Sequence, residues 1–82
     1  MSIMSLTLTL ERLLDSEERV KLSERSSLLG WHDYGTMELG RIMRLVAGFS
    51  PGSWIKFTFS DGYMEGDLEE VRAAVRERMP VY

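Results

Sequence analysis

His32 is the single histidine of this 82-residue chain, and the carboxylate of Asp33 follows it directly. A histidine that is oriented by a carboxylate can act as a general base, so this pair is the first place to look for catalysis. Adjacent residues rarely point at one another, however, and no serine or threonine stands in a nucleophile motif such as G-x-S-x-G. Because catalysis needs several converging groups, we expect a protein that is not an enzyme, with an enzyme using His32 and Asp33 as the last alternative.

Acidic residues are concentrated between positions 61 and 70, where carboxylate oxygens could bind a hard cation. These residues are Asp61, Glu65, Asp67, Glu69 and Glu70. Their spacing lacks the pattern of an EF-hand loop, so turn and helix-capping roles are the better interpretation. The chain contains no cysteine, and its glycines form neither a dinucleotide-binding motif nor a P-loop. We therefore expect no bound metal, no cofactor and no disulfide.

Aromatic and basic side chains are the stronger indication of function. Tryptophan and tyrosine anchor interfaces because each combines a large apolar area with a polar group, and arginine suits bidentate contacts across an interface. The six methionines supply adaptable contacts, and we expect Met37 and Met64 to be the exposed ones. The candidate partner-binding residues are Trp31, Tyr34, Arg41, Arg44, Trp54, Lys56 and Tyr63.

The segment from Ser53 to Asp67 contains the elements that position several of these candidates. Apolar and polar side chains alternate over residues 54–59, which predicts a strand with two distinct faces. One face carries Ile55, Phe57 and Phe59, and the other carries Trp54, Lys56 and Thr58. Asp61 and Gly62 predict a hairpin turn, because both residue types tolerate positive φ. A short return strand is expected over residues 63–65, ending at Gly66.

Two helices are predicted from apolar residues that recur at spacings of three and four. The first runs from about Thr36 to Ala47, with Thr36 as its N-cap and Gly48 as its C-cap. The second runs from about Asp67 to Arg78, with Asp67 as its N-cap. A loop is expected over residues 28–35, before the first helix.

The N-terminal part of the chain has two interpretations. A period of two predicts a strand over Ser5 to Leu10 and a second around Val20 and Leu22, and these two could pair as a hairpin with a long connection. The competing interpretation is helical, because Leu10, Leu13 and Leu14 have partial helical spacing. We prefer strands, while residues 10–29 remain open between strand and helix.

Together these elements predict a single globular domain over residues 1–82 of the α+β class. We expect a small two-layer sandwich, in which two helices cover one face of an antiparallel sheet of three to four strands, in the order β-β-α-β-β-α. The other face of such a sheet can meet solvent or a partner. A chain of this size has a modest core, so formation of a homodimer would be one way to bury more apolar area.

Composition narrows the class of function. With 44% apolar and 28% charged residues the chain resembles folded globular proteins, and its net charge of −3 argues against a nucleic-acid partner. No apolar run is long enough to span a bilayer, and the first ten residues lack the basic start of a signal peptide. We therefore expect a soluble cytoplasmic protein with no membrane partner.

These observations favour a non-enzymatic protein-binding module. We expect a small stand-alone regulator or inhibitor that docks on a larger protein, by class analogy with the inhibitors and antitoxins of phages and mobile elements. The alternative is a nucleic-acid-binding transcriptional regulator, in which an N-terminal β-ribbon is followed by helices and Arg41 and Arg44 contact the nucleic acid.

Overall fold

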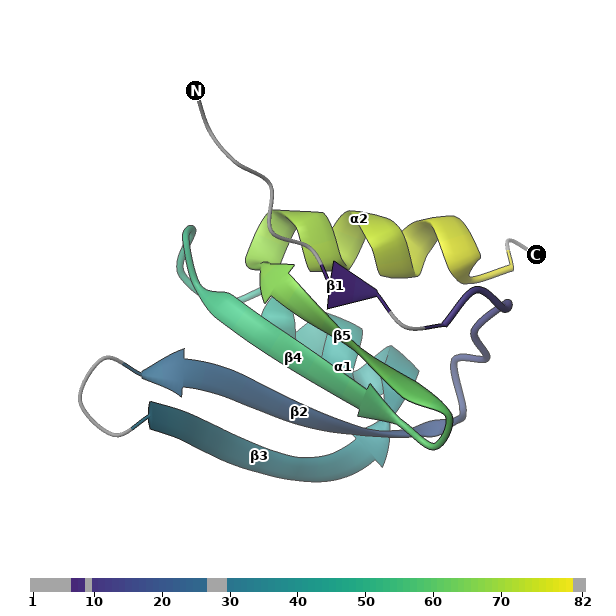
Figure 1. Cartoon of the computed structure of the whole chain (residues 1–82), viewed down its shortest axis with the longest axis horizontal. Coiled ribbons are helices and arrows are strands. Elements are labelled where there is room, and N and C mark those ends of the chain that lie inside the picture. Colours follow the sequence, from purple (N-terminus) through teal and green to yellow (C-terminus); the bar gives the residue numbers. More distant parts are fainter. Residues whose placement is uncertain (1–6, 9, 27–29, 81–82) are drawn as a thin grey trace.

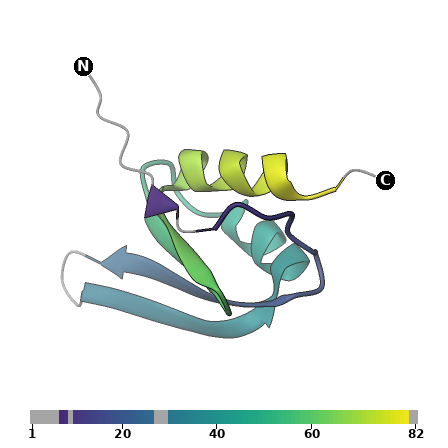
Figure 2. The same cartoon turned by 45° about the vertical axis from the view of Figure 1, so that its right-hand side comes forward.

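The computed structural model describes residues 7–8, 10–26 and 30–80, and over these residues the chain forms five strands and two helices (Figure 1). The elements are β1 (Thr7–Leu8), β2 (Arg19–Ser26), β3 (Gly30–Glu38), α1 (Leu39–Val46), β4 (Trp54–Phe59), β5 (Gly62–Asp67) and α2 (Leu68–Arg78). Both helices lie on the same side of the sheet (Figures 1 and 2). The predicted α+β class is confirmed. The four longer strands and the helices follow the order β-β-α-β-β-α, and β1 adds a two-residue strand at one edge.

The sheet is antiparallel throughout, with the strand order β1-β5-β4-β2-β3. The prediction that the N-terminal strand pairs with the strand around Val20 is wrong, because β5 and β4 lie between β1 and β2. Instead, Thr7 of β1 lies opposite Glu65 of β5. The connecting segment buries Leu10 and Leu14, so it crosses the end of the core and cannot fold straight back as a hairpin. Residues 5, 6 and 9 of the predicted strand lie outside the described residues.

The boundary between β3 and α1 differs most from the sequence prediction. Residues 30–35, expected to form a loop, belong to β3, and Thr36, expected to be an N-cap, pairs with Lys21 of β2. The helix begins at Leu39 and ends at Val46, and Ala47, not Gly48, is its C-cap. The reason is strand pairing: β2 pairs with every residue of the range 30–38 except Tyr34, whereas a helical start would leave that edge of β2 unpaired. Residues 28 and 29 of the expected loop lie outside the described residues.

The segment from 53 to 67 follows the prediction closely. Strand β4 buries its predicted apolar face, and Asp67 caps α2 by accepting a hydrogen bond from the backbone N–H of Glu69 at 3.1 Å. Three details are corrected. Strand β5 continues through the buried Gly66 to Asp67, because Ile55 pairs with that glycine, and Met64 is fully buried and therefore not exposed. The hairpin loop consists of Ser60 and Asp61, and neither Asp61 nor Gly62 has positive φ.

The core lies between the sheet and the two helices. Leu22, Phe57 and Met64 lie opposite one another on β2, β4 and β5, so their side chains form one row across the inner face of the sheet. The other buried apolar side chains are Leu10, Leu14, Val20, Leu39, Ile42, Val46, Ile55, Phe59, Leu68, Val71, Ala74 and Val75. Met37, which was expected to be exposed, packs half-buried against this core, because residue 37 lies opposite Val20 on the inner face of β3.

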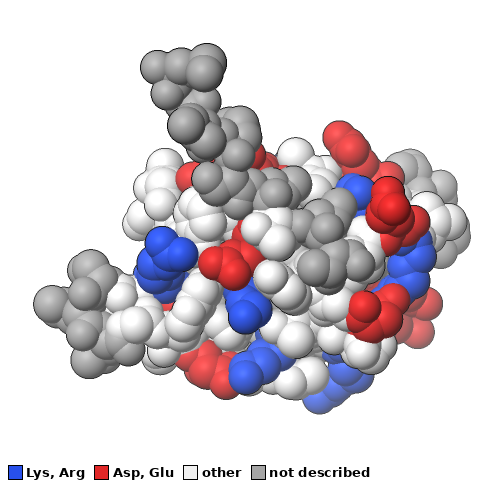
Figure 3. Space-filling model, in the orientation of Figure 1, with Lys and Arg blue, Asp and Glu red and all other residues white. Residues whose placement is uncertain are grey.

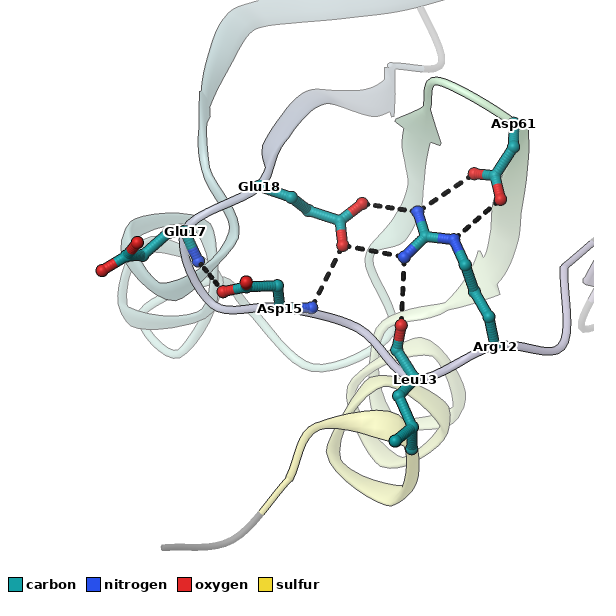
Figure 4. Close-up of polar contacts among 6 residues, drawn as sticks. All are labelled: Arg12, Leu13, Asp15, Glu17, Glu18 and Asp61. Carbon is teal, nitrogen blue, oxygen red and sulfur yellow. Dashed lines mark hydrogen bonds and ion pairs between the residues drawn. The ribbon is translucent and has the colours of Figure 1, made fainter.

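The segment before β2 is fixed to the hairpin between β4 and β5 by the guanidinium of Arg12 (Figure 4). Its Nε and Nη2 donate to the carboxylate of Asp61 at 2.7 and 3.0 Å, and its Nη1 and Nη2 donate to Glu18 at 3.0 and 2.7 Å. These hydrogen bonds raise the pKa of Arg12, and they lower the pKa of both Glu18 and Asp61 below their ordinary values. Sequence reasoning assigned no role to Arg12.

Replacing Arg12 by alanine is expected to lower the free energy of unfolding by about 1 kcal/mol at neutral pH, since partly exposed ion pairs contribute modestly. The pKa of Glu18 is depressed in the folded protein, so the stability that it contributes is complete above its ordinary value of 4.5 and is lost as the pH falls below it. Urea unfolding measured from pH 7 down to pH 3 should therefore show a shallower acid dependence in the variant. An unchanged pH profile would contradict this role.

Candidate functional site

The candidate site is the face of the sheet opposite the helices, which we call the open face. In the paired register, Lys56 of β4 lies between Ser23 of β2 and Glu65 of β5. Arg25 of β2 lies opposite Trp31 of β3, next to the row that contains Lys56. The strands therefore bring side chains from four separate parts of the sequence onto one surface.

Three aromatic and two basic side chains interleave on this surface. The guanidinium carbon of Arg25 lies 5.7 Å from the ring centroid of Trp31 and 4.8 Å from that of Trp54. The ammonium of Lys56 lies 5.6 Å from the ring centroid of Trp31 and 4.9 Å from that of Tyr63. Each such contact contributes about 0.5–1 kcal/mol at an exposed position, and together they fix the orientation of the rings.

Glu65 holds two members of this arrangement in place. One carboxylate oxygen accepts a hydrogen bond from the indole N–H of Trp54 at 2.8 Å and lies 3.5 Å from a guanidinium nitrogen of Arg25. We refer to Arg25, Trp31, Trp54, Lys56, Tyr63 and Glu65 as the cation–aromatic cluster. Trp31 is 42% exposed, and the Arg25 side chain is 54% exposed. The cluster is therefore ordered by its own contacts and accessible from outside.

Charge on the open face is mixed. Lys21 lies 3.2 Å from Asp33, just as Arg25 lies beside Glu65. The pKa of Asp33 is lowered, first by the backbone N–H of Gly35 and then by Lys21. The space-filling view, which looks onto the strands with α1 behind them, shows basic and acidic groups interspersed among uncharged ones (Figure 3). The described residues of this face therefore form no continuous basic surface.

Four of the seven residues selected from the sequence meet in this cluster, and three do not. Tyr34 lies on the helix side, where its hydroxyl donates to Glu24 at 2.7 Å, its ring contacts Phe49, and its pKa is raised. Residues 31 and 34 are three apart along β3, so the alternation of side chains places Tyr34 on the face opposite Trp31, and the register shift beside Leu22 leaves Tyr34 as an extra residue in β3. Arg41 and Arg44 are exposed on α1, in the other layer of the fold.

The groups considered for catalysis and metal binding make other contacts. His32 packs its ring edge-on against Tyr34, whereas Asp33 faces Lys21 on the open face, so the two side chains diverge. Asp61 binds Arg12, Glu65 binds Trp54, and Asp67 caps α2. Within the described residues there is no pocket and no group of three or more side chains suited to hold a metal ion.

Sequence reasoning missed Arg25 and Glu65, which connect the aromatic residues to one another. A signal was present in both cases. Arg25 lies four residues after Lys21, so in a strand both side chains point to the same face, but the predicted strand around Val20 and Leu22 did not extend to residue 25. Glu65 stood at the end of the predicted return strand and was weighed as a ligand for a cation, because its neighbours in the sequence are acidic.

Comparison of this chain with protein-family models, with curated proteins and with solved structures finds no match. The fold defines its class: a small α+β protein with an antiparallel sheet that is covered by two helices on one face and by no described helix on the other. None of the described helices is long and apolar enough to cross a bilayer.

Proposed function

We propose that this chain is a non-enzymatic protein-binding module, a small regulator or inhibitor that docks on a larger protein through its open face. The observation that supports the proposal is the cation–aromatic cluster, which is accessible and lies on the sheet face that no described helix covers. Tryptophan, tyrosine and arginine are the residues that dominate binding energy at protein interfaces. Their pre-ordering by Glu65 reduces the conformational entropy lost on binding.

The mixed charge of the open face favours a protein over a nucleic acid as the partner. Binding to a phosphate backbone requires several basic groups that are free to neutralise phosphates. Here Lys21 and Arg25 are already paired with Asp33 and Glu65, and the net charge of the chain is −3. Protein interfaces, in contrast, commonly combine aromatic residues with interspersed charges of both signs.

A cytoplasmic inhibitor or antitoxin of the kind encoded by phages and mobile elements is the class analogy that suits a small acidic chain without cysteine. A homodimer formed through the same open face is compatible with this role. Size-exclusion chromatography with light scattering over a range of concentrations distinguishes self-association from docking on another protein.

Replacing Trp31 and Trp54 together by alanine is expected to abolish capture of the physiological partner from a host lysate, with an affinity loss of at least about thirtyfold, since interface hot spots contribute about 2 kcal/mol or more. The matched control replaces Arg41 and Arg44 by alanine, which changes the helix layer and leaves the open face intact. Quantitative pull-down followed by titration of the captured protein measures both. Capture that survives the tryptophan changes and is lost in the arginine control would contradict the proposed location.

A nucleic-acid-binding regulator is the second candidate. The observation in its favour is that rings lie beside Arg25 and Lys56, because aromatic rings and basic side chains together form surfaces for single-stranded nucleic acids. The β-ribbon expected for a transcriptional regulator is not formed, since β1 pairs with β5 and not with β2. Oligonucleotide binding that weakens steeply with salt and requires Arg25 and Lys56, or Arg41 and Arg44, would favour this candidate over protein docking.

A further inference from the structure

Lys56 differs in its surroundings from Lys21 and Arg25, two other basic residues of the open face. Lys21 and Arg25 each have a carboxylate within 3.5 Å, namely Asp33 and Glu65. Across the described ranges 7–8, 10–26 and 30–80, no carboxylate lies within 4.0 Å of the Lys56 ammonium, although its side chain is half-buried. The ammonium is held over the rings of Trp31 and Tyr63. Within the described residues it is therefore a positive charge that is held against two rings and has no carboxylate in contact.

We propose that Lys56 and the two rings beside it bind a carboxylate of the partner, presented by an Asp or Glu side chain within an extended, otherwise apolar peptide segment. The inference rests on the proposed function and specifies the chemistry of the partner. A carboxylate that reaches Lys56 forms a charge-assisted hydrogen bond, which is stronger than a neutral one. The flanking rings exclude water and lower the effective dielectric constant, which strengthens the attraction further.

Two observations favour a single carboxylate over a cationic group or a phosphate backbone as the ligand of this site. The rings of Trp31, Trp54 and Tyr63 already carry Arg25 and Lys56 against them, so a cationic partner group would meet like charge where it would need an open aromatic face. A compact ammonium held between two rings suits one carboxylate, whereas a phosphate backbone needs a row of unmatched basic groups. The aromatic surface around the ammonium accepts the apolar neighbours of that carboxylate.

The test uses the full chain and a display library of randomised short peptides that is selected for binding to it. Selected peptides are expected to be enriched in Asp or Glu next to apolar residues. Changing the selected acid to its amide should weaken binding about tenfold, and so should Lys56→Gln, because each removes the charge-assisted hydrogen bond. The two changes together should cost no more than either one alone, since they remove the same contact.

Lys21→Gln is the matched control, because it removes a lysine from the same face that is already paired with Asp33. This control should leave peptide affinity within about twofold, since an exposed ion pair contributes little. Lys56→Arg should retain most of the binding, since it keeps the positive charge. Circular dichroism and thermal unfolding of each variant check that the fold is preserved.

Three results would overturn the inference: selection of no peptide, selection without acidic enrichment, and equal loss in the Lys56 and Lys21 variants. Its failure is distinguishable from failure of the proposed function. If binding is lost on replacing Trp31 and Trp54 but is indifferent to Lys56→Gln, the open face is the docking surface and the carboxylate inference is wrong. If neither replacement affects binding, both are wrong. Lys56-dependent binding of single-stranded oligonucleotides in place of acidic peptides would overturn both in favour of a nucleic-acid partner.

Discussion

Replacing Phe57 by alanine is expected to remove most of the stability of this protein. Phe57 is fully buried and lies opposite Leu22 on one side and Met64 on the other, so its ring fills the middle of the inner sheet face. Truncation of a buried phenylalanine costs about 3–5 kcal/mol, through lost burial and the cavity that remains. A chain of this length has a total stability of roughly 4–12 kcal/mol, so the variant should unfold at much lower urea concentration or lack a folded baseline.

Phe57→Leu keeps this measurement interpretable, because leucine fills part of the same space and the variant should remain folded with a smaller loss of stability. Thr58→Ala is the matched control on the same strand, since residue 58 faces outward next to the buried phenylalanine. Urea unfolding followed by circular dichroism measures all three variants. A loss of less than about 1 kcal/mol on replacing Phe57 by alanine would contradict the central position given to this ring.

Replacing Leu13 by alanine and replacing Leu14 by alanine are expected to have very different effects on the free energy of unfolding, although the two residues are adjacent. Leu14 is completely buried and its backbone N–H donates to the carbonyl oxygen of Arg78 at 2.8 Å, which joins the segment before β2 to the end of α2. Its truncation should cost about 2–5 kcal/mol. Leu13 is 69% exposed, and its truncation should change stability by no more than about 0.5 kcal/mol.

The leucine pair is a close control, because the residue type, the substitution and the sequence position are matched. The comparison tests whether residues 10–18, which contain no regular secondary structure, are an integral part of the fold. Thermal and urea unfolding of both variants give the two free energies. Equal losses for the two positions would show that this segment does not pack against the core as described.

Local sequence was sufficient to predict the segment from residue 53 to the end of α2. The alternation of Ile55, Phe57 and Phe59 with polar residues matches the burial of β4, and Asp67 caps the helix that follows. Here the apolar period, the turn and the cap all agree with the tertiary packing. Gly66 shows where local rules fail. A glycine commonly interrupts a strand, yet β5 continues through it because Ile55 of β4 supplies a paired partner.

Between residue 10 and residue 38 the strand around Val20 and Leu22 was predicted correctly, whereas the segment before it and the strand after it were not. Leu10 and Leu14 are buried without belonging to a strand or helix, so no periodic pattern of apolar residues indicates their burial. Strand β3 is exposed along most of its length, and therefore shows no alternation of apolar and polar residues. It is a strand because β2 pairs with it, and such pairing depends on residues that are distant from any local pattern.

The candidate site also consists of residues whose position could be predicted from the sequence and residues whose position could not. The outward direction of Trp54 and Lys56 follows from the period of β4 alone, and their position beside Tyr63 follows from the hairpin. Trp31 joins them only because β3 pairs with β2, and Tyr34 is excluded because it lies three residues after Trp31 in the same strand and therefore faces the helices. Composition gave the residue types that suit an interface, whereas the strand order determined which of them meet.

The sequence by itself determined the α+β class, the faces of β4, the helix that ends at Arg78 and the residue types available for an interface. These properties depend on side-chain period and capping, which act over a few residues. Only the tertiary structure decided that β1 pairs with β5, that residues 30–38 form an edge strand, and that Arg25, Trp31 and Lys56 interleave over one face. Those contacts join residues far apart in the chain, and they form because burying one shared core fixes the order of the strands.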